Sequence, residues 1–324
     1  MDRPRCEAVA VGALVPPVGL VLARDVREIP GPGWVYEPKF DGWRAVVFTG
    51  LGVVQSRRNS DLAARFPEIA AAARALGDVV VDGELVALRE GRLDFGSLAV
   101  MPRARAATGV EVYFVAFDLL AVGDDDLRET PLASRRARLE EVFARARPPL
   151  QLTPSTRDRP ATRLWMRAES AQVGIEGVVA KKTASRYRAG RTGDWVKVRQ
   201  KIVVDAVVVG VAGPLTRPEA LLLARPDAHD VLLPIGLSLP LPPAFRDEAA
   251  GLVVPTGEPR RRLPTTVLGQ EGSEYVPVHP TLVVEAEAEA TVMTFTARLR
   301  PRIHRFRTDL APADLGAVAR PDVE

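Results

Sequence analysis

The apolar residues of this chain come in short runs that are interrupted by glycine and proline. These interruptions limit the folds that the chain can adopt. Runs at 34–36, 44–56, 79–81, 85–88, 113–120, 178–180 and 195–198 have the length and valine-rich content of strands. Helical spacing is confined to residues 60–76, ended by Gly77, and to residues 131–146. No apolar stretch approaches the roughly twenty residues of a membrane span. The pattern therefore predicts many short strands and few helices.

The pattern changes past residue 201. Residues 202–211 form a long apolar run of the β type, and residues 285–290 alternate glutamate with alanine. Short strands at regular spacing between proline and glycine breaks are typical of a small β-barrel. A chain of 324 residues is long enough for two domains. We therefore predict one domain over residues 1–200 and a second over residues 201–324.

The composition disfavours several classes of site. The one cysteine, Cys6, excludes an intrachain disulfide and a cysteine-based zinc site, and three histidines disfavour a histidine-centred site. Any metal is expected to be a hard cation on carboxylates. The N-terminus lacks the pattern of a signal peptide, so a cytoplasmic protein is expected. A net charge of +3 permits a nucleic-acid partner without requiring one.

Lysine is scarce, because only five of the 44 basic residues are lysines rather than arginines. A lysine can lose its proton and act as a nucleophile, whereas arginine cannot. Lys39 lies in the segment Glu-Pro-Lys-Phe-Asp-Gly-Trp-Arg at residues 37–44, which we expect to form a turn between two strands. Lys-x-Asp-Gly alone is a weak signal, since an Asp-Gly turn after a strand is common. Its meaning depends on the rest of the chain.

Further short motifs follow Lys39 in a fixed order. They are Lys39-Phe40-Asp41-Gly42 with Arg44, Ser56-Arg57, Val81-Asp82-Gly83-Glu84-Leu85 with Val115-Ala116-Phe117-Asp118, Glu176-Gly177-Val178-Val179-Ala180-Lys181, Trp195-Val196-Lys197-Val198-Arg199, and Arg307-Thr308-Asp309. This series resembles that of the covalent nucleotidyltransferases, and specifically the minimal ATP-dependent DNA ligases of bacteria. The order and spacing are more specific than any single motif.

The resemblance implies a fold and an activity. Residues 1–200 would form an α+β nucleotidyltransferase domain, ATP-grasp-like with mainly antiparallel sheets, and residues 201–324 an OB-type barrel. The activity would be sealing of nicks in DNA through lysyl-AMP and DNA-adenylate intermediates, in repair or end joining. ATP and a divalent cation, Mg²⁺ or Mn²⁺, would be required. Nicked duplex DNA and Ku-type end-joining proteins would be the partners of a monomer with no membrane attachment.

The resemblance also implies roles for individual residues. Lys39 would be the nucleophile, and Glu84 and Glu176 would hold the metal. Arg307 and Asp309 of the barrel would assist the first step, in which Lys39 takes AMP from ATP. ATP would be bound by Glu37, Lys39, Arg44, Arg57, Glu84, Phe117, Lys181, Lys197 and Arg199, and DNA by Arg44, Arg57 and Arg191. From the residues alone, Phe117 fits an apolar core equally well. The glutamates and arginines also fit an ordinary solvated surface.

Several positions depart from the pattern of the family. Arg199 and Leu310 stand where lysine is usual, and Arg58-Asn59 replaces Asn-Gly after the second motif. Leu310 raises the question of how well the barrel assists the first step. Two alternatives therefore stay open. One is an RNA ligase or capping-type nucleotidyltransferase, and the other is a catalytically impaired homologue that only binds nucleic acid.

Overall fold

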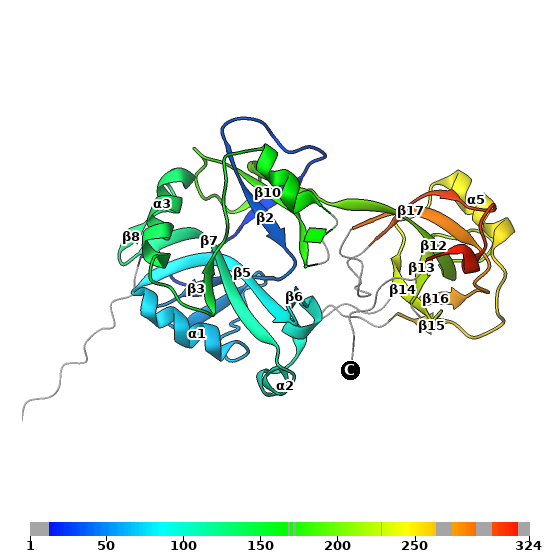
Figure 1. Cartoon of the computed structure of the whole chain (residues 1–324), viewed down its shortest axis with the longest axis horizontal. Coiled ribbons are helices and arrows are strands. Elements are labelled where there is room, and N and C mark those ends of the chain that lie inside the picture. Colours follow the sequence, from blue (N-terminus) through cyan, green and yellow to red (C-terminus); the bar gives the residue numbers. More distant parts are fainter. Residues whose placement is uncertain are drawn as a thin grey trace, which may run out of the picture. The chain divides into compact units, whose positions relative to one another are not determined.

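The computed structural model describes residues 13–167, 169–170, 173–227, 229–263, 274–289 and 300–316 (Figure 1). Cys6 lies outside these residues. The chain divides between Arg199 and Gln200 into two compact units, which we call the first and the second unit. The first unit combines two β-sheets with a few short helices, so its architecture is α+β.

The larger sheet of the first unit has the strand order β4-β3-β5-β7-β8, with β6 beside β5 and β9 beside β7. We call it the helix-covered sheet. All its pairs are antiparallel except β7 with β9. Its strands are β3 (Trp43–Phe48), β4 (Val53–Ser56), β5 (Val79–Arg89), β6 (Arg92–Leu93), β7 (Glu111–Val122), β8 (Asp125–Asp126) and β9 (Leu150–Leu152).

The second sheet of this unit has four strands in the order β1-β11-β10-β2. We call it the four-stranded sheet. Strands β1 and β11 are parallel, and the other two pairs are antiparallel. The strands are β1 (Val21–Asp25), β2 (Trp34–Phe40), β10 (Ile175–Lys182) and β11 (Gly190–Arg199).

Short helices cover one face of the helix-covered sheet. Ile69 of α1 (Pro67–Ala73) and Leu139 of α3 (Leu132–Phe143) are fully buried against Val81, Leu85 and Phe114 of the sheet. The remaining helical segments are α2 (Pro102–Ala107), η1 (Arg74–Leu76), η2 (Phe95–Ala99) and η3 (Pro160–Met166). The helices thus cover one face of the sheet, and the opposite face can pack against other elements.

That opposite face packs against the four-stranded sheet. Val46 and Leu120 of the helix-covered sheet share a buried core with Val21, Trp195 and the neighbouring Tyr187. The far side of the four-stranded sheet has its own small core, which contains Tyr36, Val178, Ala180 and Val196 and is covered by Trp165. The first unit therefore has four layers: the short helices, the helix-covered sheet, the four-stranded sheet, and η3.

The structure corrects three local expectations. Lys39 lies within β2, and the turn is formed by Asp41 and Gly42 instead. Helix α1 begins only at Pro67, because the residue before a proline is pushed out of the helical region. Residues 79–89 form one continuous strand, with a change of register between Asp82 and Gly83 where two strands were expected. The glycine sits at a bulge rather than in a turn.

The second unit is built mainly of strands. The order β14-β13-β12-β16-β15 is extended by β17, which pairs with β12, and by β18, which pairs with β17. Its elements are β12 (Lys201–Ala212), β13 (Ala220–Pro226), β14 (Leu232–Leu237), α5 (Pro243–Leu252), β15 (Arg261–Arg262), β16 (Glu274–Pro277), β17 (Val283–Glu289), β18 (Arg302–Phe306) and η4 (Pro312–Asp314). Val208, Leu221, Val284 and Phe306 lie in one buried core. None of the helices in the described ranges has the length and apolar character that crossing a bilayer requires.

Candidate active site

The register of the four-stranded sheet gathers the predicted site residues on one face. Lys39 pairs with Gly177, which pairs with Arg199, and Glu37 is linked through Val179 to Lys197 in the same way. Alternate residues of a strand share a face, so these side chains lie in neighbouring rows. Their face is the one opposite the Tyr36 core, and it therefore looks toward the helix-covered sheet.

Glu176 reaches this site because of a bulge. The pairing of β10 with β2 changes register between Ile175 and Gly177, and Glu176 is the residue at the shift. A bulge re-aims the side chain it carries. Here the ammonium of Lys39 donates to the carboxylate of Glu176 and forms an ion pair with it. The two residues predicted as nucleophile and metal ligand are therefore in direct contact.

Gly177 makes the bulge possible. Its φ is +146°, a conformation that residues with a side chain rarely adopt. A β-carbon at this position would also collide with the backbone carbonyl of Val198 on β11. The glycine between Glu176 and Val178 is thus required both by the backbone conformation and by the close approach of the neighbouring strand.

The helix-covered sheet supplies Arg44 and Glu84. They are paired neighbours on β3 and β5, on the face that looks toward the four-stranded sheet. Burial raises the pKa of Glu84 to about 7, although the positive charges of Lys39 and Arg44 oppose the shift. The two carboxylates predicted to hold a metal, Glu84 and Glu176, are thus both within electrostatic reach of Lys39.

Arg44 is fixed by buried acceptors. It donates to both carboxylate oxygens of Asp82, at 3.0 and 2.6 Å, and to the carbonyl of Val21 at 2.5 Å. The hydroxyl of Tyr187 donates to Asp82 at 2.6 Å. Burial and the adjacent Asp82 raise the pKa of Tyr187 well above its usual value, so the phenol stays a donor. The Arg44 guanidinium also lies 5.3 Å from the ring centre of Phe117.

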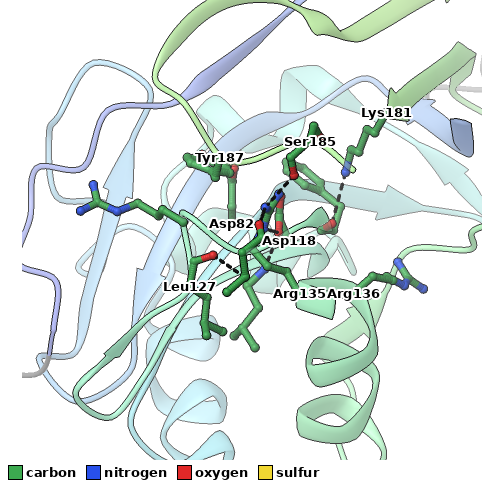
Figure 2. A network of polar contacts seen from close by, with 12 residues as sticks. Asp82, Asp118, Leu127, Arg135, Arg136, Lys181, Ser185 and Tyr187 are labelled. Atoms are coloured by element: carbon green, nitrogen blue, oxygen red, sulfur yellow. Dashed lines mark hydrogen bonds and ion pairs between the residues drawn. The ribbon is translucent and has the colours of Figure 1, made fainter. Parts of the chain in front are cut away.

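A second buried ion pair supports the loop that carries Tyr187 (Figure 2). Arg135 of α3 donates to both oxygens of Asp118 at 2.8 Å, and neither side chain is exposed. Arg135 also donates to the carbonyls of Thr130 and Ser185. The figure shows how the helix, the strand β7 and the loop after β10 converge on this arginine. Arg135 therefore holds the loop at Ser185, two residues before Tyr187.

Lys181, which is predicted to bind ATP, is buried. Its side chain is 1% exposed, pairs with Glu37 at 2.6 Å, and donates to the carbonyl of Phe117 at 3.2 Å. Its ammonium lies 4.3 Å from the ring centre of Phe117 and 4.2 Å from that of Trp195. Burial lowers the pKa of Lys181, an effect that Glu37 opposes. Phe117 itself is only partly buried and contacts the core between the sheets.

Lys197 and Arg199 meet one carboxylate that the motifs do not include. Asp25 of β1 lies 3.5 Å from the Lys197 ammonium and 3.1 Å from the Arg199 guanidinium. The exposed Arg57 is close enough to Lys197 to help lower its pKa, after the larger effects of burial and Arg199. Lys197 and Arg199, two of the residues predicted to bind ATP, thus share one carboxylate.

Other predicted residues lie outside this group. Arg191 is exposed at the start of β11, beside Leu22, six residues along the chain from Lys197. Arg307 and Asp309 belong to the second unit, where they form two hydrogen bonds of 2.8 and 2.7 Å with each other. Arg307 also pairs with Asp205 at 3.0 Å.

The donor set around Lys39 fits one type of metal site. In the part of the chain that the structure describes, no group of three or more His, Cys, Asp or Glu side chains could hold a metal. Mg²⁺ often takes only one or two protein carboxylates and completes its shell with phosphate oxygens and water. Glu84 and Glu176 suit a cation that arrives with a nucleotide, and not a dedicated protein metal centre.

The sequence analysis missed several residues that shape the site. Tyr187 lies in a segment otherwise noted only for Arg191, and Asp82 was noted without a role. Arg135 and Asp25 had no recognisable signal, because an arginine in a helix and an aspartate at a strand end are common. Their importance comes from the contacts described above, which join segments far apart in the chain.

Comparisons with known proteins agree with this architecture. The family model described as an ATP dependent DNA ligase domain matches residues 21–199, more than half of the chain. DNA ligase C2 of Mycolicibacterium smegmatis is 39% identical over 207 residues, which are 61% of this chain and 58% of that protein. The end joining protein LigD of Pseudomonas aeruginosa is 35% identical over 199 residues, 60% of this chain and 23% of that protein.

Solved structures give the same result. The ligase domain of LigD from M. tuberculosis matches with a TM-score of 0.52 and 26% identity, covering 93% of this chain and 98% of that one. A mycobacterial DNA ligase D complexed with ATP matches with a TM-score of 0.51 and 26% identity, over 93% and 98% of the two chains. The chain spans less than two thirds of the curated relatives DNA ligase C2 and LigD. Because the family model covers all the strands of the site, the chain belongs to the family of ATP-dependent DNA ligase domains.

Proposed function

We propose that this chain is an ATP-dependent DNA ligase that seals breaks in duplex DNA, in repair or end joining. One observation carries the proposal. Lys39, the lysine of the first motif, lies in contact with Glu176 on a sheet face that also bears Lys197 and Arg199. A nucleophile beside carboxylates and cations is what transfer of a nucleotide to a lysine requires.

The first step charges Lys39 with AMP. Attack needs a neutral amine, so the contact of Lys39 with Glu176 must open and the ammonium must give a proton to solvent water first. The Lys39 nitrogen then bonds to the α-phosphorus of ATP. The bond from that phosphorus to the bridging oxygen breaks, and pyrophosphate departs with the electron pair. Lys197, Arg199 and Arg57 would neutralise the phosphate charge that develops.

The next two steps use the lysyl-AMP. A 5′-phosphate oxygen at the break attacks the α-phosphorus, the Lys39 nitrogen is released and takes up a proton, and a DNA-adenylate forms. The 3′-hydroxyl then attacks the 5′-phosphorus, loses its proton, and displaces AMP. Arg44 is rigidly held by Asp82, which suits a residue that must present its guanidinium to a ribose or a phosphate. Arg57 and Arg191 are exposed and would contact the DNA backbone.

Glu84 and Glu176 would hold the divalent cation, Mg²⁺ or Mn²⁺. When bound, the cation would supply positive charge at the phosphates. Glu37 and Lys181 would shape the buried side of the nucleotide site, and Phe117 would stack on the adenine. Phe117 is partly buried beside Lys181 and Arg44, and this position between the sheets supports the proposal.

The second unit would be an OB-type barrel that assists the first step through Arg307 and Asp309. Its strand-rich topology and separate core support this assignment. The name of the LigD relative, a non-homologous end joining protein, supports a role in end joining. Nicked duplex DNA, Ku-type end-joining proteins and a monomeric, cytoplasmic state complete the proposal.

Labelling with α-labelled ATP and a divalent cation, read on a denaturing gel, tests the proposal. Label that survives denaturation should appear with the unaltered chain and disappear in Lys39→Ala. Lys182→Ala is the matched control, because Lys182 points to the other side of β10 and pairs with the exposed Asp194. This variant should label normally.

A chase separates the alternatives. Adding nicked duplex DNA should release the label as AMP and join the strands, while nicked RNA or α-labelled GTP should be poorer substrates. A blank result has to be repeated after pyrophosphate treatment, since a chain purified with AMP already attached cannot be labelled again. If the treated chain still takes no label, the ligase assignment is wrong and a nucleic-acid-binding homologue takes its place.

A further inference from the structure

Asp25 holds an unusual position among the cations of the candidate site. Strand β1 runs parallel to β11, and the register places Asp25 beside Lys197. The amide of the next residue, Val26, donates to the carbonyl of Lys197 at 3.0 Å. The backbone therefore fixes the α-carbon of Asp25 beside Lys197.

The Asp25 carboxylate bridges two cations that are predicted to bind ATP. One oxygen lies 3.1 Å from the Arg199 guanidinium and the other lies 3.5 Å from the Lys197 ammonium. Lys197 and Arg199 are two residues apart on one strand, so both point to the same face. A third cation, Arg57, is near enough to influence Lys197. A single anion with two oxygens thus bridges Lys197 and Arg199.

This arrangement has a chemical consequence for any phosphate ligand. A phosphate group, like a carboxylate, offers two or more anionic oxygens to paired cations. Asp25 is 60% exposed, whereas Lys197 and Arg199 are 21% and 33% exposed, so the carboxylate lies on the solvent side of the pair. A phosphate that binds these cations must either displace the Asp25 carboxylate or bind more weakly because the two anions repel each other.

We propose that Asp25 is a built-in competitor for phosphate, which weakens the hold of Lys197 and Arg199 on the triphosphate of ATP and on pyrophosphate. This inference rests on the proposed function where it names the nucleotide and the first step of the reaction. Asp25 acts through the two cations and is therefore a positioning residue. By keeping pyrophosphate weakly bound, it favours departure of the leaving group and opposes reversal of the first step.

Equilibrium binding of pyrophosphate tests the inference, with and without added Mg²⁺. The full chain with Lys39→Ala is the background, so that no covalent chemistry can intervene. Removing one negative charge near the ligand with Asp25→Asn should tighten binding by about threefold to tenfold at low salt. The gain should shrink as the salt concentration rises. A merely structural role for Asp25 would not produce tighter binding.

Two further variants make the test specific. Glu28→Gln removes the same charge from an exposed residue three positions on, and should change pyrophosphate binding less than about twofold. In the Lys197→Ala background, Asp25→Asn should give a smaller gain than with Lys197 present. Unchanged or weaker binding in Asp25→Asn, or an equal gain in Glu28→Gln or without Lys197, would overturn the inference.

The outcome stays separate from that of the proposed function. Failure of AMP labelling in the unaltered chain, even after pyrophosphate treatment, would remove the ligase assignment and leave the pyrophosphate result as a property of an anion site. Successful labelling with no gain in Asp25→Asn would remove only the competitor role.

Discussion

Arg44 illustrates how individual side chains of the site are held. Its guanidinium is fixed by Asp82 and by a backbone carbonyl, and Asp82 is in turn held by the hydroxyl of Tyr187. A charged group that is held on several sides keeps one orientation, which matters for a residue that must present donors to a ligand. The same logic applies to Arg135 and Asp118 further inside.

Tyr187→Phe should remove the hydrogen bond to Asp82 and destabilise the chain by about 1 kcal/mol at neutral pH. The pKa of Tyr187 is raised well above 10.0 in the folded chain, so the folded chain binds the phenolic proton more tightly than the unfolded chain. This stabilisation is complete below pH 10 and is lost as the pH rises above it. Urea unfolding at about pH 9 and at about pH 11 should therefore show a shrinking difference between the two proteins.

Tyr113→Phe serves as the control for this prediction. The Tyr113 hydroxyl donates only to the exposed Glu111, at 3.2 Å. Its loss should cost little at either pH. An equal effect of the two substitutions would mean that the buried contact with Asp82 contributes nothing specific.

Arg135→Met should be among the most destabilising single changes in the first unit. It leaves the fully buried Asp118 without its partner, at a cost of about 3–5 kcal/mol. Arg138→Met on the same helix breaks an exposed pair with Asp125 and should cost less than about 1 kcal/mol. Urea denaturation of both variants checks the contrast, and similar losses for the two would contradict it.

At the scale of elements, the bulge in β10 determines the geometry around Lys39. A regular strand would place residues 175, 177 and 179 on the site face and turn Glu176 away, because the side-chain period of a strand is two. The register shift before Gly177 instead brings Glu176 to Lys39. The bulge thus adds a carboxylate to a face that otherwise carries cations.

Gly177→Ala should destabilise the chain by about 1–3 kcal/mol, because the residue needs a positive φ and has no room for a β-carbon. It should also lower AMP labelling of Lys39, since Glu176 would no longer be aimed at the site. Gly193→Ala in β11 is the matched control, because its β-carbon would meet open space. Calorimetry and labelling of both variants provide the measurement. A Gly177→Ala chain that labels normally would show that the bulge is dispensable.

At the scale of the whole molecule, each unit contains its own buried core. Three clusters belong to the first unit and one belongs to the second among the described residues. A unit with its own core can in principle fold alone. The site residues from Asp25 to Arg199 all lie in the first unit, so its chemistry can be studied separately from Arg307 and Asp309.

A chain ending at Arg199 should therefore fold by itself and unfold in one cooperative thermal transition. Circular dichroism at increasing temperature would show a sharp loss of signal. Residues 200–324 alone should give a second, independent transition. A gradual, featureless melt of the first piece would mean that its three cores are not sufficient.

The many short strands and few helices of the first unit could be predicted from the sequence. These features depend on residue type and spacing along the chain, which local chemistry and strand periodicity reveal directly. The strands at 113–120, 178–180 and 195–198 lie within β7, β10 and β11 for the same reason. Even so, the sequence could not place Lys39 inside a strand or show that residues 79–89 are continuous.

Only the tertiary structure decided how the side chains meet. Strand register puts Lys39, Lys197 and Arg199 on one face, and a bulge adds Glu176 to it. Asp25 meets Lys197 through a parallel pairing of segments about 170 residues apart, a contact that no local pattern encodes. The sequence determined which chemical groups the protein has, because these are fixed by residue identity. The packing of the two sheets determined which groups are neighbours, because register and burial are properties of the folded chain as a whole.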